Sequence, residues 1–361
     1  MKRRLLVTGG AGFIGSNFIR YIQSNEPETT IVNLDLLTYA GSLENLKGLP
    51  LPGNHHFVKG DICDQSLVES LIRDHRIDTI INFAAESHVD RSLEGPSAFI
   101  QTNIVGTFSL LEVARKVWLQ EGHLNEKSVR FHHISTDEVY GTLKPEEPAF
   151  EETTPYAPNS PYAASKASSD HLVRSYAHSF GLPVTISNCS NNYGPYQFPE
   201  KLIPLMILNA ITGKPLPIYG DGMQIRDWLY VEDHCEAIWA IIQEGKIGES
   251  YNIGGGNQPP NIEIVKTICG ILDEKEGFSE FVPHDQLIKY VKDRPGHDRR
   301  YDMNFEKIND DLGWQPKHNL KEGLRDTVEW YLENIDWLNA IITEKDYQNW
   351  MQINYDQRGK K

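Results

Sequence analysis

The sequence predicts an α/β fold, in which a doubly wound parallel sheet carries helices on both faces and a smaller mixed α/β domain follows in the C-terminal half. The first half of the chain alternates apolar, strand-like runs with longer helical stretches, an order that builds a parallel sheet. A glycine-rich segment beginning at Thr8 directly follows the first apolar run. After Asn192 the alternation gives way to Gly-Pro turns and short elements, which indicate the second domain.

Strands and helices are expected to alternate up to residue 190. The first apolar run is too short for a signal peptide and ends in glycines, so it is predicted to be a strand. The apolar runs predict strands at Arg4–Thr8, Thr30–Asp35, His56–Gly60, Thr79–Ala85, Arg130–Ser135 and Pro183–Cys189. The longer stretches between and after them predict helices at Gly12–Gln23, Gln65–Asp74, Pro96–Glu121 and Pro161–Phe180.

The second half predicts shorter elements. Trp228–Val231 is expected to be a strand and Asp233–Gln243 a helix, and Tyr251–Gly256 is expected to return to the main sheet. From about Pro260 to Trp337 the pattern predicts helices and loops only.

Composition restricts the class of protein. The 361 residues carry a net charge of −15, which argues against nucleic-acid partners and anionic membranes, and no segment is long and apolar enough to span a bilayer. The four cysteines are scattered without paired spacing, which favours a reduced cytoplasm. The histidine pairs His55-His56 and His132-His133 lack the spacing of metal ligands, so no metal site is expected.

The glycine-rich segment Thr8–Gly15 has the spacing and setting of a dinucleotide-binding turn. It leads from a strand into a helix, where glycines allow a pyrophosphate to approach the backbone and the helix N-terminus supplies amide donors. Asp35 ends the second strand, where a carboxylate binds a ribose diol and repels a 2′-phosphate, so NAD is favoured over NADP. The alternative is a structural turn with a surface aspartate.

The predicted domains follow from this turn. Residues 1–190 are expected to form a Rossmann-like NAD-binding domain, with a return at about 228–256. Residues 191–361 are expected to form mainly a substrate-binding domain that is interleaved with the first. Asp61-Ile62 and Ala84–Ser87 follow the third and fourth strands, where the adenine and ribose would lie.

Tyr162 and Lys166 are candidate redox residues because their i, i+4 spacing places them on one helix face. The ammonium is expected to lower the pKa of the phenol, which then accepts a hydroxyl proton while hydride leaves the same carbon. Asp137 and Glu138 follow a strand directly, and neighbouring carboxyls with separated pKa values provide an acid and a base. Thr136 is expected to bind a sugar hydroxyl. The alternatives are a surface pair and a solvated acidic loop.

Several cationic residues are candidates for binding a substrate diphosphate, since guanidinium and ammonium groups suit phosphate oxygens. They are Lys201, Arg226, Arg294 and His297. Tyr219 is a candidate for stacking on a nucleotide base. Each of the charged side chains is also explained as an ordinary surface charge, and Tyr219 as packing within the second domain.

These motifs together resemble the extended short-chain dehydrogenase/reductase superfamily, and within it the 4,6-dehydratases of nucleotide sugars. The resemblance runs from Leu5 to about Trp330 and rests on TGGAGFIGSNF, NFAAESHVDRS, STDEVYG, SPYAASKASSD and SNNYGPYQFPEKLIP. Asp137 before Glu138 is the most specific feature, because the superfamily's epimerases lack this pair and its decarboxylases usually have serine before the glutamate. Leu36, Asn188 and Asp302 depart from the pattern of the family.

The resemblance implies that dTDP-glucose is converted to its 4-keto-6-deoxy product and water, in deoxysugar (dTDP-rhamnose) biosynthesis, with NAD regenerated at each turnover. The implied catalytic residues are Thr136, Asp137, Glu138, Tyr162 and Lys166. The implied cofactor contacts are Gly9, Gly12, Phe13, Ile14, Gly15, Asp35, Leu36, Leu37, Thr38, Asp61, Ile62, Phe83, Ala84, Ala85, Ser87, Thr102, Tyr162, Lys166 and Asn192. The implied substrate contacts are Ser87, Thr136, Asn191, Lys201, Leu202, Pro217, Tyr219, Arg226, Asn261, Arg294 and His297.

The resemblance also implies a cytoplasmic homodimer formed through a four-helix bundle of Pro96–Glu121 and Pro161–Phe180. Two other functions remain open at this point. One is a UDP-sugar 4-epimerase or decarboxylase of the same superfamily, since the preference for thymine over uracil rests on the resemblance alone. The other is a non-catalytic protein that binds NAD as a sensor, although such a protein has no need of Tyr162 and Lys166 together.

Overall fold

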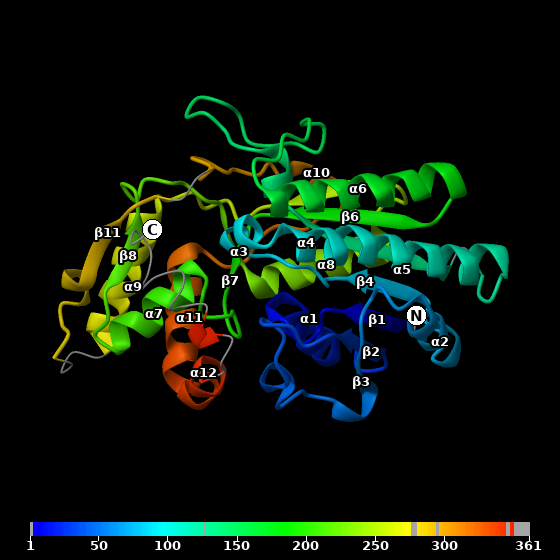
Figure 1. Cartoon of the computed structure of the whole chain (residues 1–361), viewed down its shortest axis with the longest axis horizontal. Helices are drawn as coiled ribbons and strands as arrows, with labels where there is room; N and C mark the ends of the chain where they lie inside the picture. Colours follow the sequence, from blue (N-terminus) through cyan, green and yellow to red (C-terminus); the bar gives the residue numbers. More distant parts are fainter. Residues whose placement is uncertain (1–2, 126–127, 276–279, 294–295, 344–346, 350–361) are drawn as a thin grey trace.

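The computed structural model describes residues 3–125, 128–275, 280–293, 296–343 and 347–349. Its centre is a seven-stranded parallel sheet with the strand order β10-β6-β5-β4-β1-β2-β3 (Figure 1). The strands are β1 (Arg4–Thr8), β2 (Thr30–Asp35), β3 (His55–Lys59), β4 (Thr79–Asn82), β5 (Arg130–Thr136), β6 (Val184–Cys189) and β10 (Ser250–Ile253). The order runs outwards in two directions from β1 and β4, which makes a Rossmann-like doubly wound sheet with a ligand crevice at the strands' carboxyl ends.

Helices cover both faces of this sheet, and the side chains of each strand point alternately to the two faces. Leu5 and Val7 of β1 face a cluster formed with α1 (Phe13–Asn25) and α8 (Val231–Glu244). Leu6 of the same strand points to the other face, as the two-residue period of a strand requires. The helices that cover that face are α2 (Gln65–Asp74), α5 (Thr107–Ala114) and α6 (Pro161–Phe180).

Two long helical segments lie side by side on this second face (Figure 1). One runs from Pro96 to Gln120 and comprises α4 (Pro96–Phe99), the π-helical η3 (Ile100–Gly106), α5 and the π-helical η4 (Arg115–Gln120). The other is α6, which begins where the Ser160 hydroxyl accepts the amide of Ala163 and ends at Gly181 in the left-handed conformation. The helices expected at Pro96–Glu121 and Pro161–Phe180 are confirmed.

The C-terminal half forms a second core around two small parallel sheets. These sheets pair β7 (Asn191–Tyr193) with β9 (Trp228–Tyr230), and β8 (Leu216–Tyr219) with β11 (Ile288–Val291). The surrounding helices gather at the left of Figure 1 and are α7 (Leu202–Ile211), α9 (Asn261–Lys275), α11 (Leu320–Glu333) and α12 (Ile335–Ile342). Short elements complete the described chain: α3 (Val89–Glu94), α10 (Glu306–Leu312), η1 (Leu43–Leu46), η2 (Pro52–Asn54), η6 (Asp137–Tyr140) and η7 (His284–Leu287).

The expected elements of the first half are confirmed within a few residues. The strand expected at Tyr251–Gly256 forms as β10 and joins the main sheet at its edge. One expectation is wrong, because β11 lies in the segment expected to contain only helices and loops. It has four residues and pairs only with β8, so its sequence carries too little alternation to be recognised. Among the described residues, no helix is long and apolar enough to cross a membrane.

Candidate active site

Two connected pockets lie at the carboxyl ends of the central strands. The first has a volume of about 300 Å³, and it is lined by the ends of β2, β5 and β6, the loops after β1, β3 and β4, and Tyr162 and Lys166 of α6. The second has a volume of about 170 Å³ and lies against β8 and α7. The residues that line both pockets, and so mark their junction, are Ser87, Glu138, Asn191, Glu200 and Lys201.

The glycine turn is packed too tightly for side chains. Gly9 has a φ of +69°, and a Cβ there would lie 2.7 Å from the backbone nitrogen of Ala84. A Cβ on Gly15 would lie 2.4 Å from the carbonyl oxygen of Gly9. Gly12 precedes α1, so the N-terminus of that helix faces the first pocket. The turn therefore has the close backbone approach and the amide donors that a pyrophosphate needs.

Asp35 lies at the rim of the first pocket, where its side chain is tied to the backbone. Its Oδ2 accepts the amide of Ala11 at 2.9 Å and its Oδ1 accepts that of Leu37 at 2.8 Å. Burial raises the pKa of this carboxyl, although both hydrogen bonds oppose the rise. A carboxylate at this place can accept the hydroxyls of a ribose diol and would repel a 2′-phosphate.

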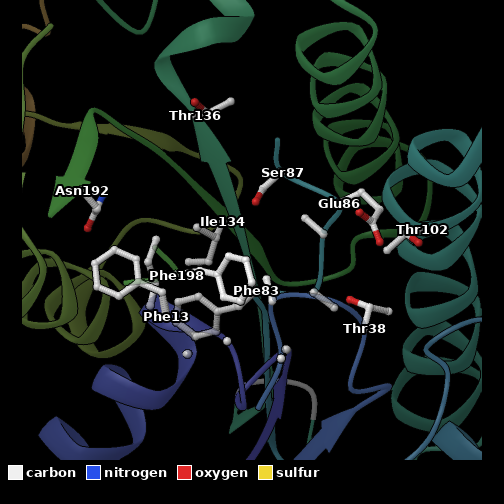
Figure 2. A pocket seen from close by; sticks show the side chains of 18 of the residues that line it. Phe13, Thr38, Phe83, Glu86, Ser87, Thr102, Ile134, Thr136, Asn192 and Phe198 are labelled. Carbon is white, nitrogen blue, oxygen red and sulfur yellow. The ribbon is translucent and has the colours of Figure 1, made fainter. Parts of the chain in front are cut away.

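The first pocket brings together the expected cofactor contacts except one. Leu37 does not line it, because its backbone, with a φ of +58°, turns the chain there and only its amide faces Asp35. Sequence reasoning missed Phe198, whose ring gathers with those of Phe13 and Phe83 on one side of the pocket, opposite Thr38 and Thr102 (Figure 2). Other lining residues that were missed are Leu34, Ala40, Gly41, Gly60, Glu86, Ile134, Ser135, Cys189, Ser190, Gln197 and Glu200. Glu86 falls within Ala84–Ser87, and the stretches STDEVYG and SNNYGPYQFPEKLIP contain Ser135, Ser190, Gln197, Phe198 and Glu200, but no role was assigned to any of them.

The second pocket contains most of the expected substrate contacts. They are Ser87, Asn191, Lys201, Leu202, Pro217, Tyr219, Arg226, Asn261 and His297. Thr136 lines the first pocket instead, and Arg294 lies outside the described residues. Further lining residues that sequence reasoning missed are His88, Val89, Asp90, Leu205, Met206, Ile218, Gly222, Gln224 and Trp228. The first three lie within the NFAAESHVDRS stretch but were assigned no role.

The charged side chains of the second pocket already have protein partners. Arg226 is buried, donates to the carbonyl oxygens of Ile225 and Asp298, and lies over the ring of Tyr301. The Nζ of Lys201 donates to the carbonyl oxygen of Ser87 at 3.1 Å. These cations are therefore held in place at the wall of the pocket before any anion binds.

Asp137 and Glu138 have different surroundings at the junction of the pockets. The side chain of Thr136 caps η6, and its hydroxyl donates to Oδ1 of Asp137 at 3.1 Å. Asp137 is only 2% exposed, and its Oδ2 has no hydrogen-bond partner among the described residues. Burial, followed by the neighbouring Glu138, raises the pKa of Asp137 well above its usual range. Burial therefore favours the protonated form of Asp137, while the half-buried Glu138 lines both pockets.

Tyr162 and Lys166 also line the first pocket, but one expectation about them is wrong. Burial, and then Glu138 and Cys189, raise the pKa of Tyr162 well above its usual range. The expected lowering by Lys166 is absent because the Nζ of Lys166 donates to the carbonyl oxygen of Ile134 at 2.7 Å. The protein's own groups therefore leave the phenol protonated, and a positive charge on a bound cofactor would have to oppose the burial.

Comparisons with known proteins find nucleotide-sugar 4,6-dehydratases, and at lower identity also 4-epimerases such as that of Thermotoga maritima, whose structure is 29% identical. A family model described as GDP-mannose 4,6 dehydratase matches residues 6–327. A dTDP-glucose 4,6-dehydratase of Salmonella typhimurium is 54% identical over 98% of this chain and 99% of its own length. The solved structure of a dTDP-glucose 4,6-dehydratase from Bacillus anthracis with NAD is 44% identical, covers 94% of this chain and 99% of its own, and has a TM-score of 0.83. The corresponding enzyme of Streptomyces venezuelae, also solved with NAD, is 44% identical over the same shares, with a TM-score of 0.84.

Proposed function

The chain belongs to the dTDP-glucose 4,6-dehydratase family of the extended short-chain dehydrogenase/reductase superfamily, and we propose that it converts dTDP-glucose to dTDP-4-keto-6-deoxyglucose and water. NAD is its cofactor. The observation that carries this proposal is the adjacent carboxyl pair in the wall of the first pocket, in which Asp137 is buried and has a raised pKa, beside Glu138, which lines both pockets. An epimerase, which only oxidises and reduces one carbon, has no use for an acid and a base at this point.

The first pocket suits NAD by its shape and by its polar groups. The tight glycine turn would bind the pyrophosphate, Asp35 the adenosine ribose, and Lys166 and Asn192 the nicotinamide side of the cofactor. NAD supplies a hydride acceptor that is restored within each turnover. The phenyl rings of Phe13, Phe83 and Phe198 exclude water from one side of the pocket.

Tyr162 is proposed to be the base of the oxidation. Its phenolate oxygen accepts the proton of the glucose 4-hydroxyl while C4 loses hydride, which leaves a ketone at C4 and a neutral phenol. The hydroxyl of Thr136 binds the sugar from the end of β5, and the Lys166 ammonium, with the positive charge of a bound oxidised cofactor, would stabilise the phenolate before it takes the proton. The new ketone acidifies the hydrogen at C5.

Asp137 and Glu138 are proposed to carry out the elimination. The Glu138 carboxylate removes the C5 proton, and Asp137 donates its own proton to the departing 6-hydroxyl, so that water leaves and a 5,6-alkene forms. Hydride then returns to C6 and a proton to C5, which completes the 4-keto-6-deoxy sugar. The pair suits this division because burial keeps Asp137 protonated while Glu138 faces both pockets.

The second pocket is proposed to bind the dTDP half of the substrate. Lys201, Arg226 and His297, together with Arg294, would bind the diphosphate, and Tyr219 would stack on the base. Asn191 and Asn261 offer amide groups to the sugar and the nucleoside. In this arrangement residues 1–190, with the returning strand β10, bind the cofactor and residues 191–361 mainly bind the substrate.

We further propose a cytoplasmic homodimer that acts in deoxysugar (dTDP-rhamnose) synthesis. The helical segments proposed for its four-helix bundle expose large apolar side chains, with Ile100 47%, Phe108 40% and Phe180 49% exposed. Contact with a second copy would cover such side chains. Sedimentation as a monomer at micromolar concentration would contradict this assembly.

The experiment that tests the function is mass spectrometry of the sugar nucleotide. The purified protein, without added cofactor, is incubated with dTDP-glucose and, in parallel, with UDP-glucose. Loss of one water from the dTDP sugar alone is the expected result, and it would also establish the base preference and the retained NAD. Unchanged mass with both sugars, even after NAD is added, would contradict the proposal and favour an epimerase or a binding protein.

A further inference from the structure

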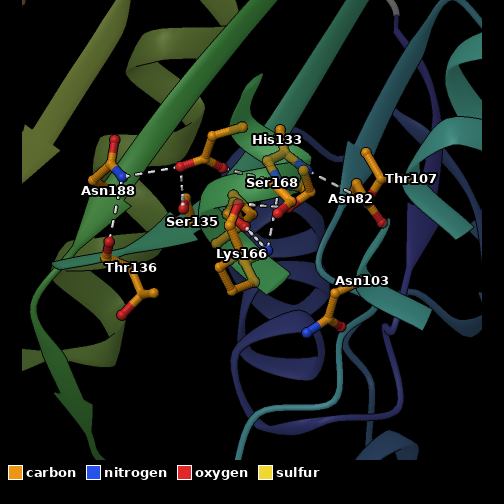
Figure 3. Close-up of polar contacts among 12 residues, drawn as sticks. Asn82, Asn103, Thr107, His133, Ser135, Thr136, Lys166, Ser168 and Asn188 are labelled. Atoms are coloured by element: carbon orange, nitrogen blue, oxygen red, sulfur yellow. Dashed lines mark hydrogen bonds and ion pairs between the residues drawn. The ribbon is translucent and has the colours of Figure 1, made fainter. Parts of the chain in front are cut away.

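A fully buried set of polar side chains lies between β5 and α6, beneath the first pocket (Figure 3). Tyr162, Lys166 and Asp170 follow one another at intervals of four along α6, so they share one face of the helix. His133 of β5 lies against the same face. The reaction proposed above assigns no role to Asp170 or His133, although both have no exposed surface.

Asp170 is held as a carboxylate despite its burial. Its Oδ2 accepts the hydroxyl of Ser135 at 2.7 Å and that of Tyr156 at 2.9 Å, and the amide nitrogen of Asn188 lies 3.4 Å away. Burial alone would raise the pKa of this carboxyl, but the His133 ring lowers it, first by its hydrogen bond and then by its charge when the ring is protonated. The charge of Lys166 and the hydroxyl of Ser135 lower it further, so that the pKa lies below its usual value. The protein therefore keeps a negative charge inside its core, and such a charge needs a compensating cation.

His133 lies between this carboxylate and Lys166 and is itself neutral. Oδ1 of Asn82 accepts the hydroxyl of Thr8, so the amide nitrogen of Asn82 donates to Nδ1 of His133 at 3.2 Å. The ring proton is then on Nε2, which lies 3.4 Å from Oδ1 of Asp170. Burial, and then Lys166, lower the pKa of His133 to about 4. The neutral ring therefore separates Asp170 from Lys166 without cancelling the attraction between the carboxylate and the ammonium.

Lys166 needs the charge that Asp170 supplies. Its side chain is 4% exposed, and its Nζ lies 2.7 Å from the carbonyl oxygen of Ile134 and 3.4 Å from Nε2 of His133. Burial lowers the pKa of this ammonium, and the charge of Asp170 is the main influence that opposes the fall.

We propose that Asp170, acting across His133, is the buried counter-charge that keeps Lys166 an ammonium in the wall of the first pocket. Asp170 and His133 are then positioning residues for the reaction. The role of Lys166 in that reaction rests on the proposed function. The charge state of Lys166 is nevertheless a property of this chain and is measurable without turnover, so failure of one proposal is distinguishable from failure of the other.

Arg174 is a rival partner for Asp170. It donates to the phenol oxygen of Tyr156 at 2.9 Å, and Tyr156 in turn donates to the carboxylate. If Asp170 served only to anchor Arg174, Lys166 would titrate normally without it. The titratable and charged groups around the pair are His133 of β5, Tyr140 of η6, Glu152 and Tyr156 before α6, Tyr162 and Arg174 of α6, and Cys189 of β6. The segment η3 packs on the same helix through Asn103, whose amide donates to the hydroxyl of Ser165.

The test measures the titration of Lys166 by nuclear magnetic resonance of the full-length protein labelled with ¹³C-lysine. The signal of Lys166 is assigned by its loss in Lys166→Arg. In Asp170→Asn the midpoint is expected to fall by about one pH unit or more, because an opposite charge at this range has been removed. Tyr156→Phe, which cuts the link to Arg174 and keeps the carboxylate, is the matched control and should move the midpoint by only a few tenths of a unit. Asp170→Glu should restore most of the native value.

An unchanged midpoint in folded Asp170→Asn, or equal shifts in Asp170→Asn and Tyr156→Phe, would overturn the proposal. A kinetic readout accompanies the titration: in Asp170→Asn the alkaline limit of NADH formation from substrate should move to lower pH by a similar shift, without a matching change in KM.

If Asp170→Asn does not fold, Lys166→Met tests the same interaction through its effect on the pKa of Asp170. Asp170 has a lowered pKa, so its contribution to stability is lost as the pH falls through that pKa. Without Lys166 the pKa rises, and the gain in Tm between about pH 2 and pH 4 should be smaller than in the native protein. An identical gain in both proteins would contradict the counter-charge.

Discussion

The two pockets bind by different means. The cofactor pocket is built from the ends of neighbouring strands, and its limits are steric: a Cβ on Gly9 or Gly15 would meet backbone atoms within 3 Å. The substrate pocket takes its side chains from segments far apart in the chain, and polar contacts hold them. Nδ1 of His297 lies 2.6 Å from Oδ1 of Asp293, and outside the pocket lining the exposed Arg299 pairs with Asp221 at 2.9 Å.

This difference predicts how each pocket should respond to a substitution. A misfit in the cofactor pocket cannot relax, because the parallel sheet fixes the backbone that would have to move. A lost charge at the edge of the substrate pocket is screened by water and leaves the other contacts in place. The pair Asp137 and Glu138 depends on backbone position as well as on electrostatics, since the end of β5 positions it and burial raises the pKa of Asp137.

The largest effect is expected at Tyr162. Tyr162→Phe removes the proton acceptor of the oxidation and keeps the ring, so NADH formation on adding substrate should fall by about a thousandfold or more. The measurement is the absorbance of NADH in a single turnover, with the bound NAD quantified beforehand. Formation at the native rate would remove Tyr162 from the role of base.

A steric change in the cofactor pocket should have the next largest effect. In Gly15→Ala the new methyl group would lie 2.4 Å from the carbonyl oxygen of Gly9, so the affinity for NAD should fall by about a hundredfold. The matched control is Gly53→Ala, where nothing lies within 4 Å of the added Cβ. Calorimetric titration with NAD compares the two, and equal affinities would show that the turn tolerates side chains.

The pH dependence should separate the two chemical steps. Asp137 acts in its protonated form and its pKa is raised, so water loss should decrease about tenfold per pH unit above that pKa. NADH formation does not use this proton and should not follow the same decrease. Rapid-quench sampling of the dehydrated sugar, beside NADH absorbance, measures both. A common alkaline limit for the two steps would contradict the role of Asp137 as the acid.

The smallest effect is expected from the exposed pair Asp221 and Arg299. These side chains are 59% and 50% exposed, and such a pair contributes about 1 kcal/mol or less. Arg299→Ala should therefore raise the KM for the nucleotide sugar by no more than about fivefold and leave kcat unchanged. Steady-state kinetics at low and high salt measure this, and a large fall in kcat would place Arg299 in the chemistry.

The two pockets also differ in how well the sequence predicts them. Gly9, Gly15 and Asp35 occupy fixed places relative to a strand and a helix, so a short motif suffices to place them in the cofactor pocket. Phe198 and Trp228 belong to the second core, and only the packing of that core brings their rings to the pockets, although Phe198 lies within a stretch that resembles the family. Strand β11 was missed for the same reason, because its partner β8 lies far away in the sequence.

Electrostatics was the hardest part to predict. The i, i+4 spacing of Tyr162 and Lys166 predicts a contact between them, whereas in the fold the Lys166 ammonium is bound to the carbonyl oxygen of Ile134. Burial then dominates the pKa of both groups. The degree of burial is a property of the folded chain, so a sequence motif names the reacting groups but not their protonation states.

The measurement that tests the central claim most directly is the partition between oxidation and water loss in Asp137→Asn. The variant is mixed with dTDP-glucose in a single turnover while NADH absorbance and the mass of the sugar are followed together. NADH formation should stay within about threefold of the native rate, and water loss should slow by about a hundredfold, because only the second step uses the acid. If both steps slowed equally, or if water loss kept its native rate, Asp137 would not be the acid of the elimination.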